Sequence, residues 1–207
     1  EHPHVSRRAF LKRSAIAAAV PLAVSCGTLR KSTPNAKIAV GVIGTGGRGR
    51  SHIAEGYRKL GQSRVVAVCD VNAENRGQAK KIVDEAYGDT SCATYEDFRE
   101  LLARPDIDAV SIAVPDHWHA LIAVAAARAG KHVICEKPMA ISLSSADALV
   151  KACDDAGVHL FVVKQNRLNA TVQLLKRALD KGRFGRIFMA NTTVRWTRPQ
   201  EYYDQAP

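Results

Sequence analysis

Residues 38–70 decide the fold: IAVGVIGTGGRGRSHIAEGYRKLGQSRVVAVCD. Two apolar runs, 38–43 and 64–69, each have the length of a buried strand, and they flank a glycine loop and a segment expected to be helical, 50–60. Asp70 ends the second run, 21 residues after the last glycine of the loop. A lone G-x-G-x-x-G is weak evidence. Strand, glycine loop, helix, strand and acid in this order predict a dinucleotide-binding unit.

Each position of the loop has an expected task. The residues expected to hold the nucleotide are Gly44, Thr45, Gly46, Gly47, Arg48, Gly49 and Asp70. Gly44 permits the tight turn, Gly46 lets a pyrophosphate approach the backbone, and Gly49 lets the helix pack on the strand. The N–H groups at the helix start hold the phosphates. The alternative is a glycine-rich turn that binds nothing.

Asp70 bears on the choice between NAD and NADP. Its carboxylate would accept hydrogen bonds from the adenosine ribose hydroxyls, and its charge would repel a 2′-phosphate. Arg48 and Arg50 weaken this argument, because arginines near the loop tolerate a phosphate. The sequence therefore favours NAD, with NADP less favoured.

Composition excludes some classes of partner. The chain has 207 residues and a formal net charge of +10, but its first 37 residues hold seven Lys or Arg and one acid, so they carry +6 of that charge. No basic stripe with interleaved aromatic residues follows, so we do not expect nucleic-acid binding. The five cysteines include no C-x-x-C pair, so no zinc or redox motif is indicated.

Residues 1–36 are expected to be an export segment and a tether. Ser6–Lys12, SRRAFLK, resembles a twin-arginine signal, and a short apolar run, 15–24, follows it. The residues before Cys26 resemble an imperfect lipoprotein box, so lipidation of Cys26 and plain release both stay open. The segment predicts contact with the twin-arginine export machinery and a periplasmic or extracytoplasmic protein. The alternative is a basic amphipathic helix of the mature fold.

Residues 37–161 are expected to be an α/β domain with a parallel, doubly wound sheet of Rossmann type, because strands and helices alternate at βαβ spacing. The helices are expected at 72–87, 94–102, 120–129 and 144–156, and the later strands at 108–114, 132–135 and 158–163. Thr94 is the expected N-cap of the second of these helices. Ligands in such sheets bind beyond the carboxyl ends of the strands. Three polar clusters stand at those ends: 115–119, 136–138 and 164–167.

Two of these clusters carry a specific resemblance. Residues 113–120, AVPDHWHA, and 129–138, AGKHVICEKP, resemble the Gfo/Idh/MocA family of oxidoreductases, which includes glucose–fructose oxidoreductase and inositol dehydrogenase. The resemblance covers about residues 37–207, and the strand-end Glu-Lys-Pro is its most specific mark. It implies a nicotinamide cofactor and a sugar or polyol substrate.

The resemblance also implies roles for single residues. Lys137 is expected to be catalytic, at the nicotinamide and next to the substrate hydroxyl, and Glu136 to contact the cofactor or position Lys137. Pro115 and His119 are expected to line the cofactor site, and Pro138 often follows a cis bond. His117 and His119 are spaced H-x-H, but without a third ligand in view we expect no metal.

Residues 162–207 are expected to begin an α+β substrate and oligomerisation domain. A helix is expected at 171–179 and a strand at 186–195. The runs QNR, GRFGRI and RWTRPQEYYD look most like the family branch that oxidises nucleotide-linked or related sugars. In that branch Asn166, Arg167 and Arg195 would face the substrate together with Lys137, although Arg195 is as readily a surface ion-pair partner.

Three functions remain open on the sequence. The leading one is an exported NAD(P)-dependent oxidoreductase that transfers a hydride between a sugar, sugar derivative or polyol and a tightly bound nicotinamide cofactor. The second is an NAD-dependent, redox-neutral glycoside hydrolase, and the third a non-catalytic nucleotide-binding fragment. Family members continue well beyond residue 207 and supply a downstream catalytic His, so we expect the second domain to be incomplete here. A full-length version is expected to form homo-oligomers.

Overall fold

The computed structural model of the chain describes residues 37–204. These residues divide into two units, the first ending at Val163 and the second beginning at Lys164. The predicted export signal and Cys26 lie outside the described residues. We describe each unit by itself.

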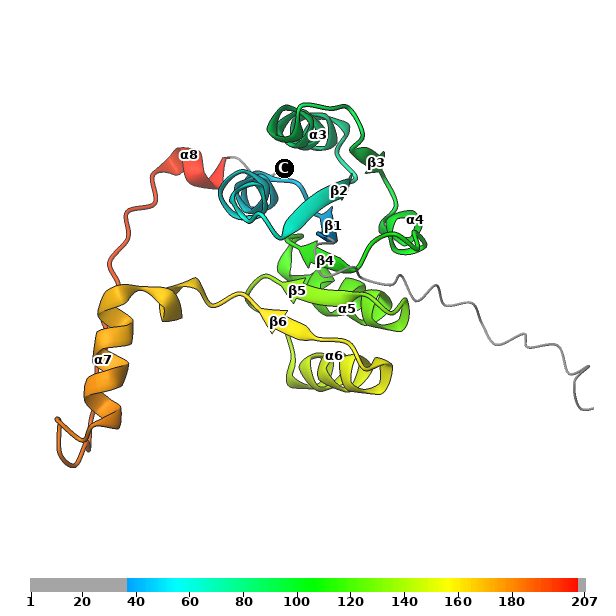
Figure 1. Cartoon of the computed structure of the whole chain (residues 1–207). Coiled ribbons are helices and arrows are strands. Elements are labelled where there is room, and N and C mark those ends of the chain that lie inside the picture. The colour runs from blue at the N-terminus through cyan, green and yellow to red at the C-terminus, as the bar shows by residue number, and fades with distance from the viewer. Residues whose placement is uncertain (1–36, 205–207) are drawn as a thin grey trace, which may run out of the picture. The chain divides into compact units, whose positions relative to one another are not determined.

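The first unit is built on one sheet of six parallel strands in the order β3-β2-β1-β4-β5-β6 (Figure 1). The strands are β1 (Ile38–Ile43), β2 (Ser63–Cys69), β3 (Ala93–Tyr95), β4 (Ala109–Ile112), β5 (His132–Cys135) and β6 (Leu160–Val162). The order reverses between β1 and β4, which is where open α/β sheets bind their ligands. The expected doubly wound parallel sheet is confirmed.

Helices cover both faces of this sheet. They are α2 (Gly47–Ser51), α3 (Ala73–Tyr87), α4 (Phe98–Leu102), α5 (His119–Arg128) and α6 (Leu143–Ala156). One core packs strand residues such as Val40 and Val68 against Ile53 and against Val83 of α3. The other packs strand side chains against α4, α5 and α6. The central strands β1 and β2 contribute side chains to both cores, in agreement with their apolar sequences.

The strands end in register. Cys69, Ile43, Ile112 and Cys135 are paired across β2, β1, β4 and β5, so they form one row. The next residues along each strand are Asp70, Gly44, Ala113 and Glu136. The backbone ladder continues through this second row, because each of its N–H groups donates to a carbonyl of a neighbouring strand. Residues far apart in the sequence are therefore placed along one edge of the sheet.

The helix after the glycine loop differs from the prediction. It begins inside the loop, at Gly47 and not at Arg50, and after α2 it continues as a π-helical turn, η1 (His52–Gly56), and a 3-10 turn, η2 (Tyr57–Lys59). Three glycines within residues 47–56 weaken the preference for a regular α-helix. π-Helical turns are rare and are frequent at functional sites.

The helix predicted at 94–102 is also wrong in part. Thr94 lies in β3, and the helix begins only at Phe98, with Asp97 as the N-cap. The Asp97 carboxylate accepts from the backbone N–H of Arg99. Both threonine and aspartate are good N-caps, but threonine also fits a strand, and pairing with β2 decides its conformation.

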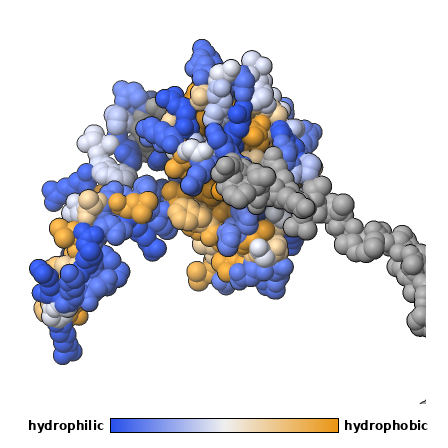
Figure 2. Space-filling view, viewed as in Figure 1, coloured by the Kyte–Doolittle hydropathy of each residue, from blue (hydrophilic) through white to orange (hydrophobic). Residues whose placement is uncertain are grey.

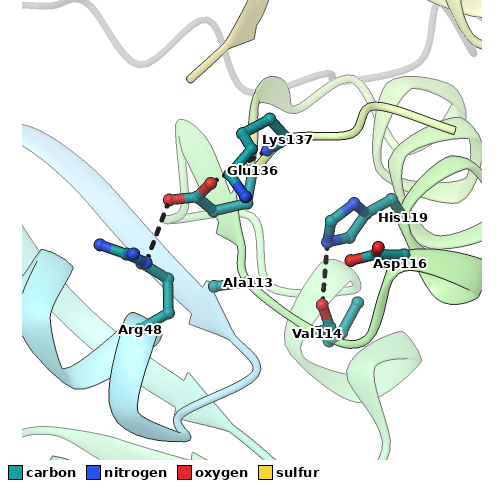
Figure 3. Close-up of a pocket in the computed structure, with 7 residues that line it drawn as sticks. All are labelled: Arg48, Ala113, Val114, Asp116, His119, Glu136 and Lys137. Atoms are coloured by element: carbon teal, nitrogen blue, oxygen red, sulfur yellow. Dashed lines mark hydrogen bonds and ion pairs between the residues drawn. The ribbon is translucent and has the colours of Figure 1, made fainter. Parts of the chain in front are cut away.

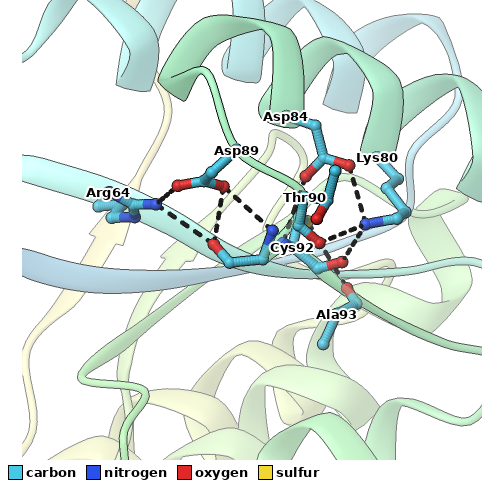
Figure 4. A network of polar contacts seen from close by, with 8 residues as sticks. Arg64, Lys80, Asp84, Asp89, Thr90, Cys92 and Ala93 are labelled. Carbon is cyan, nitrogen blue, oxygen red and sulfur yellow. Dashed lines mark hydrogen bonds and ion pairs between the residues drawn. The ribbon is translucent and has the colours of Figure 1, made fainter.

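A polar network fastens the turn between α3 and β3 (Figure 4). The Lys80 ammonium donates to the carbonyl oxygens of Thr90 and Cys92, 3.1 and 2.8 Å away, and pairs with Asp84 at 2.8 Å. Arg64 of β2 pairs with Asp89 in the same turn. The backbone carbonyls of this turn thus have partners, and the edge strand β3 is held beside β2.

The second unit has little regular structure. It contains a 3-10 turn, η4 (Gln165–Leu168), and the helices α7 (Ala170–Asp180) and α8 (Gln200–Tyr203). The strand predicted at 186–195 is wrong, because no described element pairs with these residues. Apolar side chains stay exposed on this unit, and the space-filling view shows apolar atoms on its surface (Figure 2). Phe188, for example, is 93% exposed. A β-prone sequence forms a strand only where a neighbour completes its hydrogen bonds.

Two further findings concern the described residues. None of their helices is long and apolar enough to cross a membrane. Cys69 and Cys135 are buried in the sheet, as expected from their apolar surroundings, and burial raises the pKa of each thiol to about 12. These thiols therefore stay protonated and act as small apolar side chains.

Candidate functional site

The glycine loop has the tight geometry that its sequence predicts. Gly44 has φ +83°, and a Cβ there would lie 2.6 Å from the Ala113 backbone of the neighbouring strand. A Cβ on Gly49 would lie 2.0 Å from the Gly44 carbonyl oxygen, so only glycine lets the helix approach the strand this closely. A Cβ on Gly46 would meet no protein atom within 4 Å. The open side of the loop is thus at Gly46, where a pyrophosphate was expected to approach.

Asp70 holds the loop from the neighbouring strand. Its carboxylate accepts from the backbone N–H of Thr45 at 2.7 Å and from the Thr45 hydroxyl at 3.3 Å. The other carboxylate oxygen accepts from the backbone N–H of Asn72 at 2.9 Å. Asp70 is only partly buried, so it keeps an open side at the strand end. It therefore fixes the loop and still presents a negative charge where a ribose was expected.

The two arginines of the loop have different surroundings. The Arg50 guanidinium donates to the Thr45 carbonyl oxygen and to the Asn75 side chain, both at 2.9 Å. The Arg48 side chain is 58% exposed, and its Nε lies 3.6 Å from a Glu136 oxygen. Arg50 therefore braces the loop, whereas Arg48 faces the adjoining pocket.

A pocket of about 180 Å³ lies beside the loop, at the point where the strand order reverses (Figure 3). Its lining residues are Arg48, Ala113, Val114, Asp116, His119, Glu136 and Lys137. They come from the carboxyl ends of β4 and β5, from the helical segments that follow β4, and from α2, which follows β1. The polar clusters expected at 115–119 and 136–138 thus meet at one pocket together with the glycine loop.

Lys137 is exposed at this pocket and its backbone is held on both sides. Its N–H donates to a carboxylate oxygen of Glu136 at 3.0 Å. Its bond to Pro138 is cis, in agreement with the resemblance. Glu136 is buried and also lies near Arg48 and His52. The ammonium of Lys137 therefore stands on a fixed backbone at the mouth of the pocket.

His119 fixes the same turn from the opposite side. It is 1% exposed, with Nδ1 2.5 Å from the Pro138 carbonyl oxygen and Nε2 2.9 Å from the Val114 carbonyl oxygen. Both nitrogens thus face backbone oxygens, which leaves neither for a metal. His117 is exposed, and no group of three candidate ligands occurs among residues 37–204.

The other predicted site residues have different positions. Pro115 precedes the 3-10 turn η3 (Asp116–Trp118), is exposed, and is not among the pocket-lining residues. Asn166, Arg167 and Arg195 belong to the second unit, so their predicted contact with substrate stays a prediction.

Sequence reasoning missed two polar residues, His52 and Ser111, which lie behind Glu136. Asp116 lines the pocket as part of the predicted cluster 115–119, although no role of its own was predicted for it. His52 could have been found from helical spacing, because it follows Gly49 by three residues and shares its inward face. Ser111 lies in an apolar strand, and nothing in its sequence neighbours marks it.

Comparison with known proteins agrees with this geometry. Residues 38–164 match the family model described as "Oxidoreductase family, NAD-binding Rossmann fold". An inositol 2-dehydrogenase of Pseudomonas savastanoi pv. phaseolicola is 36% identical over 167 residues, which cover 80% of this chain and 48% of the relative. A D-apiose dehydrogenase of Paraburkholderia graminis is 33% identical over 154 residues, which cover 74% of this chain and 39% of the length of that relative. The chain spans about half the length, or less, of these curated relatives.

Solved structures include a similar one with ligands. The crystal structure of the WlbA dehydrogenase from Bordetella pertussis, in complex with NADH and UDP-GlcNAcA, has 43% sequence identity and a TM-score of 0.72. The match covers 82% of this chain and 50% of that one.

Proposed function

Because the chain belongs to the Gfo/Idh/MocA family of NAD-binding oxidoreductases, we propose that the protein is an exported, NAD-dependent oxidoreductase of sugars, sugar derivatives or polyols. It would transfer a hydride between a hydroxyl-bearing carbon and a tightly held nicotinamide cofactor. The single observation that carries this proposal is the strand-end pocket, where Lys137 stands beside the glycine loop.

The residues present fit the nucleotide. The open side at Gly46 and the first turn of α2 leave backbone N–H groups for phosphates, while Asp70 stands where the adenosine ribose would lie. The pocket beyond the loop, between Arg48 and Lys137, suits the nicotinamide end. When bound, the nicotinamide supplies the hydride acceptor.

Lys137 would act on the substrate oxygen. As the hydroxyl-bearing carbon loses its hydride, negative charge develops on the oxygen, and an ammonium beside it stabilises that charge. If the ammonium first loses a proton to water, the neutral amine of Lys137 can take the hydroxyl proton as the hydride leaves, and its exposed side chain keeps that exchange with water open. Glu136 and His119 hold the turn, so the ammonium keeps its place.

The substrate class follows from similarity only. The curated relatives are named as dehydrogenases of inositol and D-apiose, and the solved neighbour holds UDP-GlcNAcA. All three compounds carry vicinal hydroxyls. Asn166, Arg167 and Arg195 are proposed to contact the substrate, and arginines there would suit an anionic sugar derivative.

Export is proposed from the sequence at Ser6–Lys12. Free NAD would be scarce outside the cytoplasm, so an exported enzyme would keep its cofactor bound and regenerate it in place. Loading before export fits a twin-arginine route. Whether Cys26 then carries a lipid would be read by mass spectrometry of the membrane fraction.

The function is tested with the full-length protein purified from its own cell envelope. Bound nucleotide is identified after denaturation, and the protein is then mixed with candidate sugars, polyols and aryl glycosides. Appearance of reduced-nicotinamide absorbance on addition of a sugar or polyol is the expected result. Release of the aryl group without net reduction would replace the proposal with a glycoside hydrolase. Absence of any nucleotide and of both reactions would leave a non-catalytic protein.

Replacing Asp70 with serine is expected to reduce the preference for NAD over NADP. The variant loses the charge that repels a 2′-phosphate and also one charged hydrogen-bond acceptor, so NAD should bind about 10-fold more weakly. The affinity for NADP should fall less than that for NAD, because both nucleotides lose the loop contact of Asp70 but only the 2′-phosphate of NADP is relieved of its repulsion. The measurement is a titration of the apo-protein with each nucleotide.

The control for Asp70→Ser is Asp147→Ser, which removes an exposed carboxylate from α6. Its nucleotide affinities should match those of the unchanged protein. An unaltered NAD to NADP ratio in Asp70→Ser would contradict the role assigned to this carboxylate.

A further inference from the structure

His52 lies behind the pocket and not among its lining residues. It is the first residue of the π-helical turn that follows the glycine-loop helix. Its Nε2 is 2.9 Å from a carboxylate oxygen of Glu136, at the end of β5. Its Nδ1 is 3.2 Å from the Ser111 hydroxyl in β4. One imidazole therefore joins the helix to two neighbouring strands.

These contacts are shielded from water. Ser111 is 0% exposed, and the side chains of His52 and Glu136 are 17% and 7% exposed. Tyr57 of η2 forms a hydrogen bond with Ser111, and burial holds the pKa of its phenol above the usual value. Hydrogen bonds in such a place hold their geometry better than exposed ones, because water does not compete for them.

The chemistry of the partners sets the direction of the bonds. The carboxylate of Glu136 only accepts, so the Nε2–H of His52 donates to it. Nδ1 faces the Ser111 hydroxyl, which can act as donor or as acceptor and therefore suits either state of the ring. The bond to Glu136 thus has a fixed direction.

Glu136 passes this constraint on to Lys137. While one of its carboxylate oxygens accepts from His52, the other accepts from the backbone N–H of Lys137 at 3.0 Å. On the far side of Lys137, His119 lies within hydrogen-bond distance of the Pro138 carbonyl oxygen. The backbone of Lys137 is therefore fixed between two histidine-supported contacts.

We propose that His52 is a positioning residue for Lys137, acting through Glu136. The inference rests on the proposed function, since it assigns to Lys137 the reacting ammonium. The π-helical turn is what directs His52 at Glu136, and it links the nucleotide-holding helix to the turn that carries the lysine. Removal of the imidazole leaves the same Glu136 oxygen with only the longer contact to Arg48, at 3.6 Å, so the carboxylate and the backbone of Lys137 are held less firmly.

The test compares His52→Ala with His52→Gln in the full-length protein. Loss of the imidazole should slow hydride transfer in a single turnover about 10- to 100-fold, the effect of a displacement of about 1 Å at a reacting group. The KM for substrate and the affinity for NAD should change by less than about threefold, because His52 touches neither. Glutamine keeps an N–H donor near Nε2, so His52→Gln should recover most of the rate.

A cycle with Glu136→Gln separates positioning from general damage. If His52 acts through Glu136, adding His52→Ala to Glu136→Gln should cost less than about threefold, because the shared contact is already altered. Equal costs in both backgrounds would overturn the proposal. His159→Ala, which removes an exposed histidine from the opposite end of the sheet, should leave the rate unchanged.

A second measurement does not depend on turnover. Hydrogen exchange at the Lys137 amide should be faster in His52→Ala than in the unchanged protein, and slow again in His52→Gln. Equal exchange in all three proteins would overturn the inference. If the unchanged protein transfers no hydride to any substrate, the proposed function fails, and the exchange result still decides whether His52 positions Lys137.

Discussion

Replacing Lys137 with alanine in the full-length protein is expected to lower the rate of hydride transfer by about 10²–10⁴-fold, the usual contribution of a positioned proton-transfer group. The ammonium is the cationic group that the Glu136–Pro138 turn presents at the pocket, and alanine leaves the developing negative charge on the substrate oxygen without it. NAD affinity should change little, because the glycine loop and Asp70 are untouched. Single-turnover absorbance and nucleotide titration measure the two effects separately.

Lys137→Arg divides the role of Lys137 into charge and proton transfer. Arginine keeps the positive charge but stays protonated, so it should restore part of the rate if charge matters and none of it if the proton must move. Lys59→Ala removes an exposed lysine from η2 and should leave the rate as it was. A Lys137→Ala protein that works within threefold of the unchanged one would refute the catalytic role.

The second large effect is expected from Gly49→Ala. The added Cβ would lie 2.0 Å from the Gly44 carbonyl oxygen, and a backbone atom cannot move aside as a side-chain end can. Helix and loop must separate, which should destabilise the protein by about 3 kcal/mol, at the upper end for overpacking. Because the start of the helix would be displaced, the affinity for NAD should also fall. Thermal unfolding with and without nucleotide measures both.

Gly46→Ala is the matched comparison for Gly49→Ala. Its Cβ meets no protein atom within 4 Å, so the fold should keep its stability. The methyl group would occupy the side from which the pyrophosphate approaches, and NAD should bind about 10- to 200-fold more weakly, as for one misplaced carbon in a pocket.

Gly77→Ala in α3, also in open space, should retain both stability and NAD binding. Equal behaviour of Gly49→Ala and Gly77→Ala would contradict the close packing of loop and helix.

Much of the nucleotide-binding unit follows from local sequence. The apolar runs, the glycine stops and the N-caps are local signals, and they predicted β5 and the ends of α3 and α6. The row of strand ends follows as well, since parallel strands with similar lengths end at one edge. Asp70, Gly44 and Glu136 are therefore neighbours in space for a reason that the sequence contains.

Other features depend on contacts that no local pattern records. Thr94 lies in a strand because β2 offers it a partner, while residues 186–195 have the composition of a strand but pair with no described element. His52 meets the buried side chains of Ser111 and Glu136, which are distant from it in sequence. In each of these places tertiary contacts, and not the local sequence preference, determine the structure.

The Thr45 backbone is held at both of its polar groups by the protein itself, its N–H by Asp70 and its carbonyl oxygen by Arg50. The loop is therefore preorganised. Ordering a flexible backbone costs about 1–2 kcal/mol per residue, and here folding has already met that cost. A nucleotide that binds this loop does not have to order its backbone, so it binds more tightly than it would to a flexible loop. The gain in affinity is expected mainly as a slower dissociation rate. Long residence of the cofactor would thus originate in two side chains, Asp70 and Arg50, that clamp the loop before any ligand arrives.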